Sequence, residues 1–143
     1  ARGVRQGDTT MALPLGLFVC GAETVVASLW EVDDTATSLL MARLYANWLG
    51  RTDSPREIDG VRYEAGRPMP KLAALREAQR WLRSLTAADR DRLVGASAEI
   101  IAGEGTRGDP RAARGTLGQA RADSHPYDHP FYWAAFTLQG SSR

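Results

Sequence analysis

The chain has 143 residues, of which 43% are hydrophobic, and a formal net charge of +1. These values fit one small globular domain and exclude a global electrostatic field for nucleic acid or membrane binding. The single cysteine excludes an internal disulfide and a cysteine-based zinc site. We recognise no secretory leader and no bilayer-spanning apolar run. We therefore expect a cytoplasmic protein. We also expect no metal and no other cofactor. Because the sequence starts at Ala1 without a methionine, we expect it to be cut from a longer chain.

Residues 8–22 are predicted to form the first helix, with Asp8 as its cap and Pro14 as a kink. Its apolar face should contain Leu13, Leu17 and Cys20. We interpret Cys20 as a buried and inert side chain, because a catalytic thiol needs a nearby base and an environment that stabilises the thiolate.

Residues 24–30 are predicted to form a strand that ends at Trp30. The strand is apolar on both faces apart from Ser28, which is typical of a buried parallel strand. Acidic residues follow at once, at Glu31, Asp33 and Asp34. Because open α/β sheets bind ligands at the carboxyl ends of their strands, this segment predicts one wall of a cleft. The alternative is structural, with Trp30 in the core and one aspartate only a helix cap.

A second helix should run from Asp33 or Asp34 to about Leu49, followed by Gly50 as the residue that ends it. Its expected apolar stripe consists of Leu40, Met41, Leu44, Tyr45, Trp48 and Leu49. Arg43 and Asn47 are expected on the opposite side.

Residues 51–69 are rich in turn formers and are predicted to be a flexible insertion, with a small hairpin at Asp59-Gly60. A third helix should start at Pro70 and reach Leu85. Its inner face is expected to be Ala74, Leu75, Ala78, Trp81, Leu82 and Leu85, with Arg76, Arg80 and Arg83 turned to solvent.

A fourth helix is predicted from the capping-box-like Thr86 and Asp89, with Leu93, Val94, Ile100 and Ile101 inward. Residues 103–124 are rich in glycine, arginine and alanine, so we expect a flexible segment that proteases cleave readily. Residues 131–138 are predicted to form the last strand.

Three further patterns carry little weight as sites. His125 and His129 have the spacing of metal ligands on a helix, but Pro126 and Pro130 disfavour a helix there. Residues 103–108 match G-x-G-x-x-G without the preceding strand that a dinucleotide site needs. The arginines of the same region lack aromatic neighbours for base stacking, so we expect a solvated loop and no nucleic-acid partner.

Several stretches together resemble a known family. Ser28-Leu29-Trp30-Glu31-Val32-Asp33-Asp34 resembles the SLW-x-VDD motif of the CHAT domain, a caspase-like cysteine peptidase domain. Gly7-Asp8 resembles its GE-type element, and Ala74-Leu75-Arg76-Glu77-Ala78-Gln79 its ALR-x-AQ helix. His129-Pro130-Phe131-Tyr132-Trp133-Ala134-Ala135-Phe136 resembles its HPYYWA-x-F strand, and Gln139-Gly140 the turn after it. The order and the rough spacing agree over most of the chain.

The resemblance implies an α/β fold: the carboxyl-terminal half of a caspase-like three-layer sandwich with a mostly parallel sheet, over residues 1–143. In that family the catalytic His and Cys stand upstream, in His-Gly and Ser-Ala-Cys contexts that this sequence lacks. No catalytic residue is therefore expected here. The resemblance assigns substrate contacts to Ser28, Trp30, Glu31 and Asp33, and the acidic sequence adds Asp34.

The expected partners are the upstream half of the same domain and a protein or peptide substrate, with no nucleic acid and no membrane. As part of the longer protein the chain would serve a cysteine endopeptidase, and the acidic residues favour substrates cut after Arg or Lys. The alternative is a non-catalytic caspase-like module for protein interaction or signalling.

Overall fold

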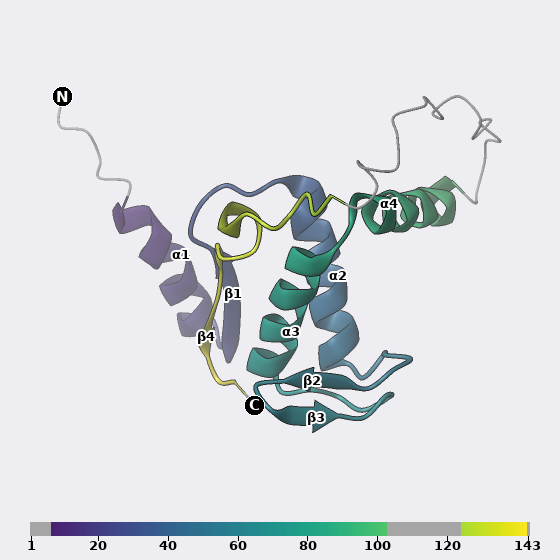
Figure 1. Ribbon diagram of the computed structural model, residues 1–143. Helices are drawn as coiled ribbons and strands as arrows, with labels where there is room; N and C mark the ends of the chain where they lie inside the picture. Colours follow the sequence, from purple (N-terminus) through teal and green to yellow (C-terminus); the bar gives the residue numbers. More distant parts are fainter. Residues whose placement is uncertain (1–6, 103–123, 143) are drawn as a thin grey trace, which may run out of the picture.

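The computed structural model describes residues 7–102 and 124–142, with side chains for residues 13–96 and 124–142. Its elements are α1 (Gly7–Val19), β1 (Thr24–Ser28), α2 (Asp34–Trp48), β2 (Arg56–Ile58), β3 (Val61–Tyr63), α3 (Lys71–Ser84), α4 (Ala87–Ala102), the 3₁₀ helix η2 (Pro130–Tyr132) and β4 (Phe136–Gly140) (Figure 1). The G-x-G-x-x-G match and nearly all of the predicted loop at 103–124 lie outside the described residues. No helix in the described part of the chain is long and apolar enough to cross a membrane.

The main sheet consists of β1 and β4, which pair in antiparallel orientation from Thr24↔Gly140 to Ser28↔Phe136. The second sheet is the antiparallel hairpin of β2 and β3. The prediction of a mostly parallel sheet, within half of a three-layer sandwich, is therefore wrong.

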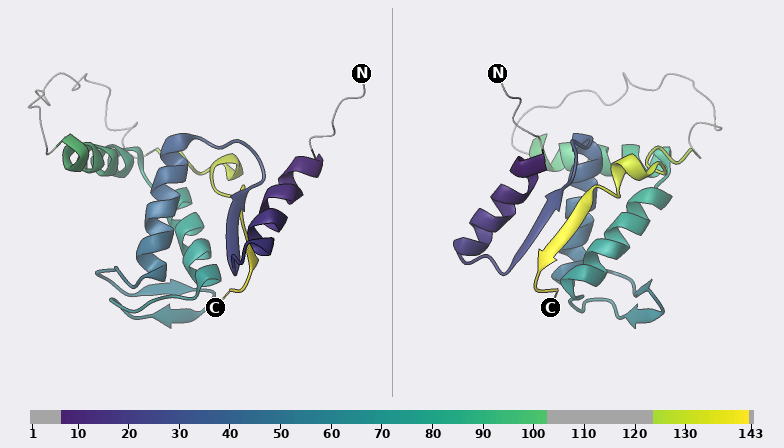
Figure 2. Two further views of the ribbon diagram at one scale, coloured as in Figure 1. Left: turned by 180° about the vertical axis from the view of Figure 1, so that it is seen from behind. Right: turned by 90° about the vertical axis from the view of Figure 1, so that its left-hand side faces the viewer.

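The physical reason is visible in the covering of the sheet. α2 and α3 lie on one face of the sheet of β1 and β4, and α1 lies alongside β1, across the sheet from α2 and α3 in Figure 1 and to one side of both strands in Figure 2. An antiparallel pair that is covered by helices on both faces is apolar on both faces, just as a buried parallel strand is. The apolar run at residues 25–29 is only partly covered, since Val25 is buried and Leu29 is 50% exposed, and it is compatible with either strand direction.

The predicted inner face of α1 is also wrong. Leu13 is 71% exposed, and Leu17 and Cys20 are exposed as well. α1 reaches the sheet through Phe18, whose ring lies against Gly140. Leu13, Leu15, Leu17 and Val19 of α1 therefore remain exposed to solvent among the described residues.

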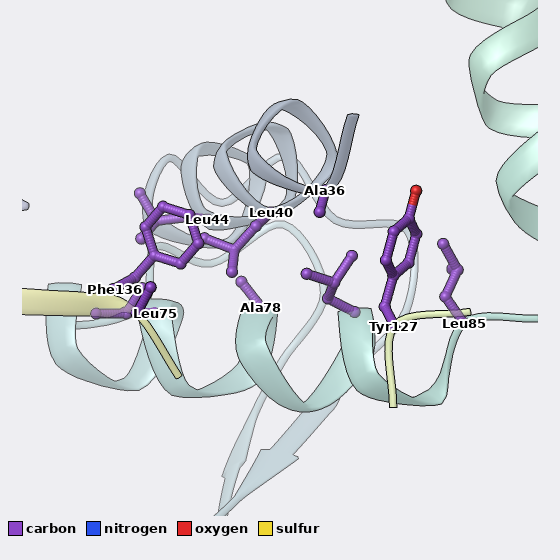
Figure 3. Packing of buried hydrophobic residues seen from close by; sticks show 10 residues of the cluster. Ala36, Leu40, Leu44, Leu75, Ala78, Leu85, Tyr127 and Phe136 are labelled. Carbon is purple, nitrogen blue, oxygen red and sulfur yellow. The ribbon is translucent and has the colours of Figure 1, made fainter. Parts of the chain in front are cut away.

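The core lies between α2, α3 and the inner face of β4 (Figure 3). It contains Ala36, Leu40 and Leu44 of α2, Leu75, Ala78, Leu82 and Leu85 of the α3 segment, and Tyr127, Ala135 and Phe136 near the carboxyl end. Tyr45, Trp48 and Leu49, which were expected in the stripe of α2, are exposed.

Both ends of α2 follow the predicted signals. The Asp33 side chain accepts a hydrogen bond from the Ala36 N–H at 2.9 Å, so Asp33 is the N-cap. Gly50 ends the helix with φ +69°, and a Cβ there would approach the backbone of Arg67 and Pro68 to 2.8 Å. Glycine is therefore required at this position for both conformation and space.

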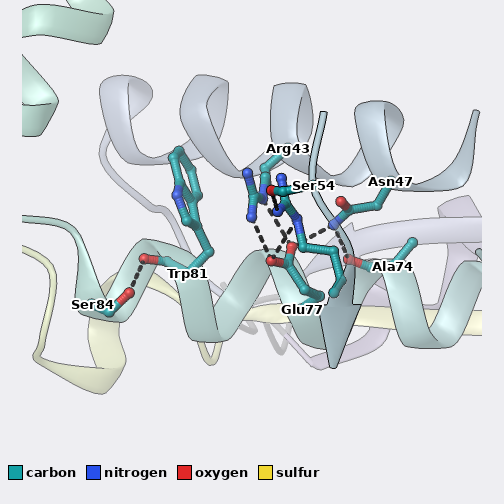
Figure 4. Close-up of polar contacts among 8 residues, drawn as sticks. Arg43, Asn47, Ser54, Ala74, Glu77, Trp81 and Ser84 are labelled. Carbon is teal, nitrogen blue, oxygen red and sulfur yellow. Dashed lines mark hydrogen bonds and ion pairs between the residues drawn. The ribbon is translucent and has the colours of Figure 1, made fainter. Parts of the chain in front are cut away.

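A buried charge network joins α2, α3 and β2 (Figure 4). Glu77 is 8% exposed and accepts hydrogen bonds from Arg43 Nε at 2.9 Å and Arg43 Nη2 at 2.6 Å. Asn47 Nδ2 also donates to Glu77, and Arg56 lies 3.6 Å from it. Burial and the nearby Arg43 charge lower the pKa of Arg56. Arg43 and Asn47, which were expected on the side opposite the apolar stripe, instead face the neighbouring helix and pair with its carboxylate.

The hairpin and the start of α4 agree with the sequence. Asp59 and Gly60 have φ +52° and φ +77°, as a type I′ turn requires. Ile58, Met69 and Ala74 form a small second core that fixes residues 51–69 to α3. At α4, the Thr86 hydroxyl accepts from the Asp89 N–H at 3.2 Å and donates to the Asp89 carboxylate at 2.7 Å, which lowers the pKa of Asp89.

The predicted strand at residues 131–138 begins too early. His129 Nδ1 accepts a hydrogen bond from the Phe131 N–H at 3.2 Å and starts η2. Strand pairing begins only where Leu29 N–H donates to the Ala135 carbonyl, at 2.9 Å. The aromatic residues that favour a strand in sequence terms therefore stand in a tight helical turn before it.

Candidate functional site

A cleft opens where β1 ends, which is the place predicted from the sequence. Its volume is about 700 Å³, and it is open to solvent. The lining residues are Trp30, Glu31, Val32, Asp33, Asp34, Phe131 and Tyr132. We call it the Trp30 cleft. The structure thus brings four of the five predicted site residues together, while Ser28 pairs with Phe136 in the sheet and lies outside the lining.

Trp30 forms the fixed aromatic side of this cleft. Its indole Nε1 donates a hydrogen bond to the Phe131 carbonyl at 2.9 Å. The Trp30 and Phe131 rings stack with centroids 6.4 Å apart and an interplanar angle of 28°. Because Trp30 remains 38% exposed, it both holds the carboxyl-terminal segment and presents a face to solvent.

The other side of the cleft is acidic. Glu31, Asp33 and Asp34 are exposed, and none forms an ion pair with a described residue. One carboxylate oxygen of Asp33 accepts the hydrogen bond that caps α2. Asp34 lies in the first turn of α2, where the helix dipole favours a negative charge. An aromatic face beside carboxylates that have no ion-pair partner in the described structure favours a cationic ligand.

Gln79 is a residue that the sequence analysis did not single out as a contact. Its Nε2 donates to the Trp133 carbonyl at 3.0 Å and to the Phe136 carbonyl at 3.1 Å. It therefore ties α3 to the segment that carries Phe131 and Tyr132. The signal in the sequence is a single amide on the edge of the apolar stripe of α3.

The histidines and the cysteine do not form a catalytic pair in the described structure. His129 uses Nδ1 to cap η2. Cys20 precedes the amino end of β1, whereas the Trp30 cleft follows its carboxyl end; the five-residue strand between them is roughly 16 Å long. Among the described residues, no group of three or more His, Cys, Asp or Glu side chains could hold a metal ion.

Comparison with known proteins gives one match. The family model of the CHAT domain matches residues 1–141. No curated protein and no solved structure matches the chain.

Proposed function

Because this chain belongs to the CHAT domain family, we propose that it is the substrate-binding part of a caspase-like cysteine endopeptidase domain. The observation that carries the proposal is the Trp30 cleft, in which a fixed aromatic side chain faces carboxylates without ion-pair partners in the described structure. The sequence contains no His-Gly and no Ser-Ala-Cys motif, so the nucleophile and its base would come from a segment outside residues 1–143.

The outer edge of β1 supports docking of such a segment. Leu29 N–H donates to the Ala135 carbonyl and Ser141 N–H donates to the Glu23 carbonyl, and antiparallel ladders alternate along the strand. The backbone groups of Val26 and its alternate neighbours therefore point away from β4. Unpaired edges of this kind accept a further strand.

The surroundings of this edge offer apolar cover for the added strand. A groove of about 540 Å³ lies beside it and is lined by Val26, Met41, Leu44 and Leu138 among others. Alongside β1, α1 exposes Leu13, Leu15 and Val19. The first proposed partner is thus the upstream half of the same domain.

In the proposed reaction, a cysteine thiolate of the docked segment attacks the scissile carbonyl, and a histidine transfers a proton to the leaving amine. Water then hydrolyses the acyl-enzyme. The part of this chain is to bind the substrate. Glu31 and Asp34 would attract an arginine or lysine side chain, which would lie against the face of Trp30.

A positional-scanning library of fluorogenic peptides tests this function with the full-length protein that contains the chain. We expect cleavage after Arg or Lys. Glu31→Gln with Asp34→Asn should lower kcat/KM for basic peptides by roughly 10- to 100-fold if the carboxylates contact the substrate. Glu57→Gln, an exposed carboxylate in the β2–β3 hairpin, is the matched control.

The same experiment separates the proposal from its alternative. Cleavage after Asp or after small apolar residues would show that the Trp30 cleft does not select the cleaved residue. A full-length protein that cleaves no peptide, yet binds a partner protein through this face, would favour the non-catalytic interaction module.

A further inference from the structure

The groove beside β1 lies at the carboxyl end of α2, whereas the Trp30 cleft lies at its amino end. The groove has a volume of about 540 Å³, and we call it the Trp48 groove. Its apolar walls come from β1, β4 and α2, through Val26, Leu138, Met41, Leu44, Tyr45 and Trp48. The Tyr45 and Trp48 rings lie 5.9 Å apart and are 51% and 36% exposed. An open apolar surface of this kind is suited to the side chains of a partner.

A cation is held at this groove. Lys71 is the first residue of α3 and the only lysine of the chain. Its Nζ donates a hydrogen bond to Thr24 Oγ1 at 2.9 Å and lies 5.6 Å from the centroid of the Trp48 ring. The Thr24 hydroxyl donates in turn to the Ser141 carbonyl at 2.7 Å. The ammonium is therefore fixed beside the first residue of β1, between a hydroxyl and an aromatic face.

No carboxylate of the described structure balances the charge of Lys71. An ammonium has three N–H donors, and Lys71 forms no ion pair with a described residue. Glu23 also lines the groove, but it is exposed and forms no ion pair with Lys71. A strand added at the edge of β1 would cover the ammonium, and a desolvated ammonium without a paired carboxylate is strongly destabilising. We therefore expect the added strand to bring the carboxylate.

The edge of β1 determines where that carboxylate would stand. The backbone groups of Thr24 and Val26 point away from β4, so both residues would pair with an added strand. Side chains that lie opposite each other in paired strands share one face of the sheet. The residue opposite Val26 would thus cover the Trp48 groove. The residue opposite Thr24, two positions along the added strand, would lie beside Lys71.

We propose that the upstream segment adds a strand to β1 in which an apolar side chain and an Asp or Glu stand two positions apart. The apolar side chain occupies the Trp48 groove, and the acidic side chain pairs with Lys71. This inference rests on the docking of the upstream half in the proposed function, and it does not depend on the peptidase chemistry. Lys71 then selects the partner strand by charge, and the groove selects it by apolar contact.

Zero-length cross-linking of the full-length protein tests this pairing. A water-soluble carbodiimide joins a lysine amine to a carboxylate in contact with it, as an amide, with loss of water. We expect mass spectrometry of tryptic peptides to show Lys71 linked to one Asp or Glu upstream of residue 1, with an apolar residue two positions from it. Lys71→Arg keeps the charge and should abolish the cross-link, because a guanidinium does not form this amide.

Charge reversal provides a second measurement that needs no cross-linker. Lys71→Glu should lower the urea midpoint of the full-length protein, because two carboxylates would then face each other. The acidic residues of the upstream segment are then changed to lysine one at a time, and we expect one of them to restore the midpoint. Arg67→Glu is the matched control, since Arg67 is exposed and forms no ion pair with a described residue. It should leave the midpoint nearly unchanged.

The outcomes separate this interface from the proposed function. An upstream cross-link or a restored midpoint supports the interface. A cross-link from Lys71 to Glu23 alone, or the absence of both an upstream cross-link and a restoring substitution, would overturn it. Cleavage of basic peptides in that case would leave the proposed function intact. A protein that shows the Lys71 pairing and cleaves no peptide would keep the interface and lose the peptidase function.

Discussion

Glu77 carries a negative charge inside the structure, held by arginines from two other elements and by the Asn47 amide. Removing one partner of a buried ion pair lowers the free energy of unfolding by more than the intact pair contributes to it, because the remaining charge stays desolvated. We expect Glu77→Gln to destabilise the full-length protein by about 3–5 kcal/mol in urea unfolding. Glu64→Gln, whose ion pair with Arg62 is exposed, should cost about 1 kcal/mol or less. Equal effects for the two variants would contradict a buried network.

Asp33 has two roles that one pair of substitutions separates. Asparagine also caps helices, so Asp33→Asn should leave the melting temperature nearly unchanged. It should weaken transition-state binding of basic peptides by about 1–3 kcal/mol in kcat/KM if the carboxylate contacts them directly. Asp33→Ala should also lower the free energy of unfolding by about 0.5–2 kcal/mol, because it removes the helix cap. An Asp33→Asn variant with unchanged specificity would leave Asp33 as a cap only.

Cys20 is exposed, and this changes what its substitution should do. We expect Cys20→Ala to alter the free energy of unfolding by about 0.5 kcal/mol or less, because exposed sites away from caps and networks tolerate change. Peptidase activity of the full-length protein should stay unchanged. In the isolated chain, Ellman's reagent should label the thiol without denaturant. Loss of turnover in a folded Cys20→Ala variant would show instead that Cys20 is catalytic.

The sequence predicted residues that have a local partner and missed those whose partner is distant. The Asp33 cap and the turn at Asp59 depend on neighbours within a few positions. Arg43 and Glu77 meet across 34 positions, so helical periodicity alone assigned Arg43 to the wrong side. Burial of a polar residue depends on the charge opposite it, which a single sequence does not reveal.

At the scale of elements, Gln79 connects α3 to the turn and strand that follow η2. Gln79→Leu would leave the carbonyls of Trp133 and Phe136 without this donor, at a cost of about 1–3 kcal/mol. We expect urea unfolding of the full-length protein to show this loss, and binding of basic peptides to weaken because Phe131 and Tyr132 shift. Gln139→Leu is the matched control, since no described residue hydrogen-bonds its side chain. Equal losses of stability and of peptide binding in Gln79→Leu and Gln139→Leu would mean that the hydrogen bonds of Gln79 do not stabilise this segment.

Helices and hairpins were predicted correctly where the sequence contains a residue that caps the helix or forms the turn. The helices at residues 34–48 and 71–84 and the hairpin are confirmed, because each has a start or stop signal of its own. The segment at residues 129–136 was misassigned because its aromatic residues favour a strand by composition. The His129 cap and Pro130 favour a 3₁₀ turn first, and only Ala135 meets β1.

At the scale of the whole molecule, the described residues leave apolar surface on α1 and an unpaired strand edge. We expect a purified protein of residues 1–143 to bind the dye ANS and to self-associate, since exposed apolar patches and open edges promote association. Size-exclusion chromatography and a thermal scan provide the measurement. A monomer that melts cooperatively at high temperature would contradict the proposal that an upstream half completes the fold.

Strand direction was the main feature that the sequence did not reveal at this scale. An apolar run indicates covering on two faces, and both parallel and antiparallel pairs satisfy it. β4 pairs with β1 from more than a hundred positions away, and neither strand alone specifies the orientation. The expectation of a cleft after β1 depends on where β1 ends and not on which way its neighbour runs.

The pairing of β1 with β4 has a practical consequence for splitting this protein into pieces. The Thr24 hydroxyl donates a hydrogen bond to the Ser141 carbonyl, 117 positions away in the sequence. Trp30 and Gln79 also donate hydrogen bonds to backbone carbonyls of the segment that contains Ser141. A peptide of residues 124–143 therefore contains the strand that pairs with β1 and the Phe131 ring that stacks on Trp30. It also contains the two carbonyl groups that accept hydrogen bonds from Gln79. Supplied separately, this peptide should reassemble with the rest of the polypeptide, so that residues 124–143 would act as a detachable tag for a complementation reporter.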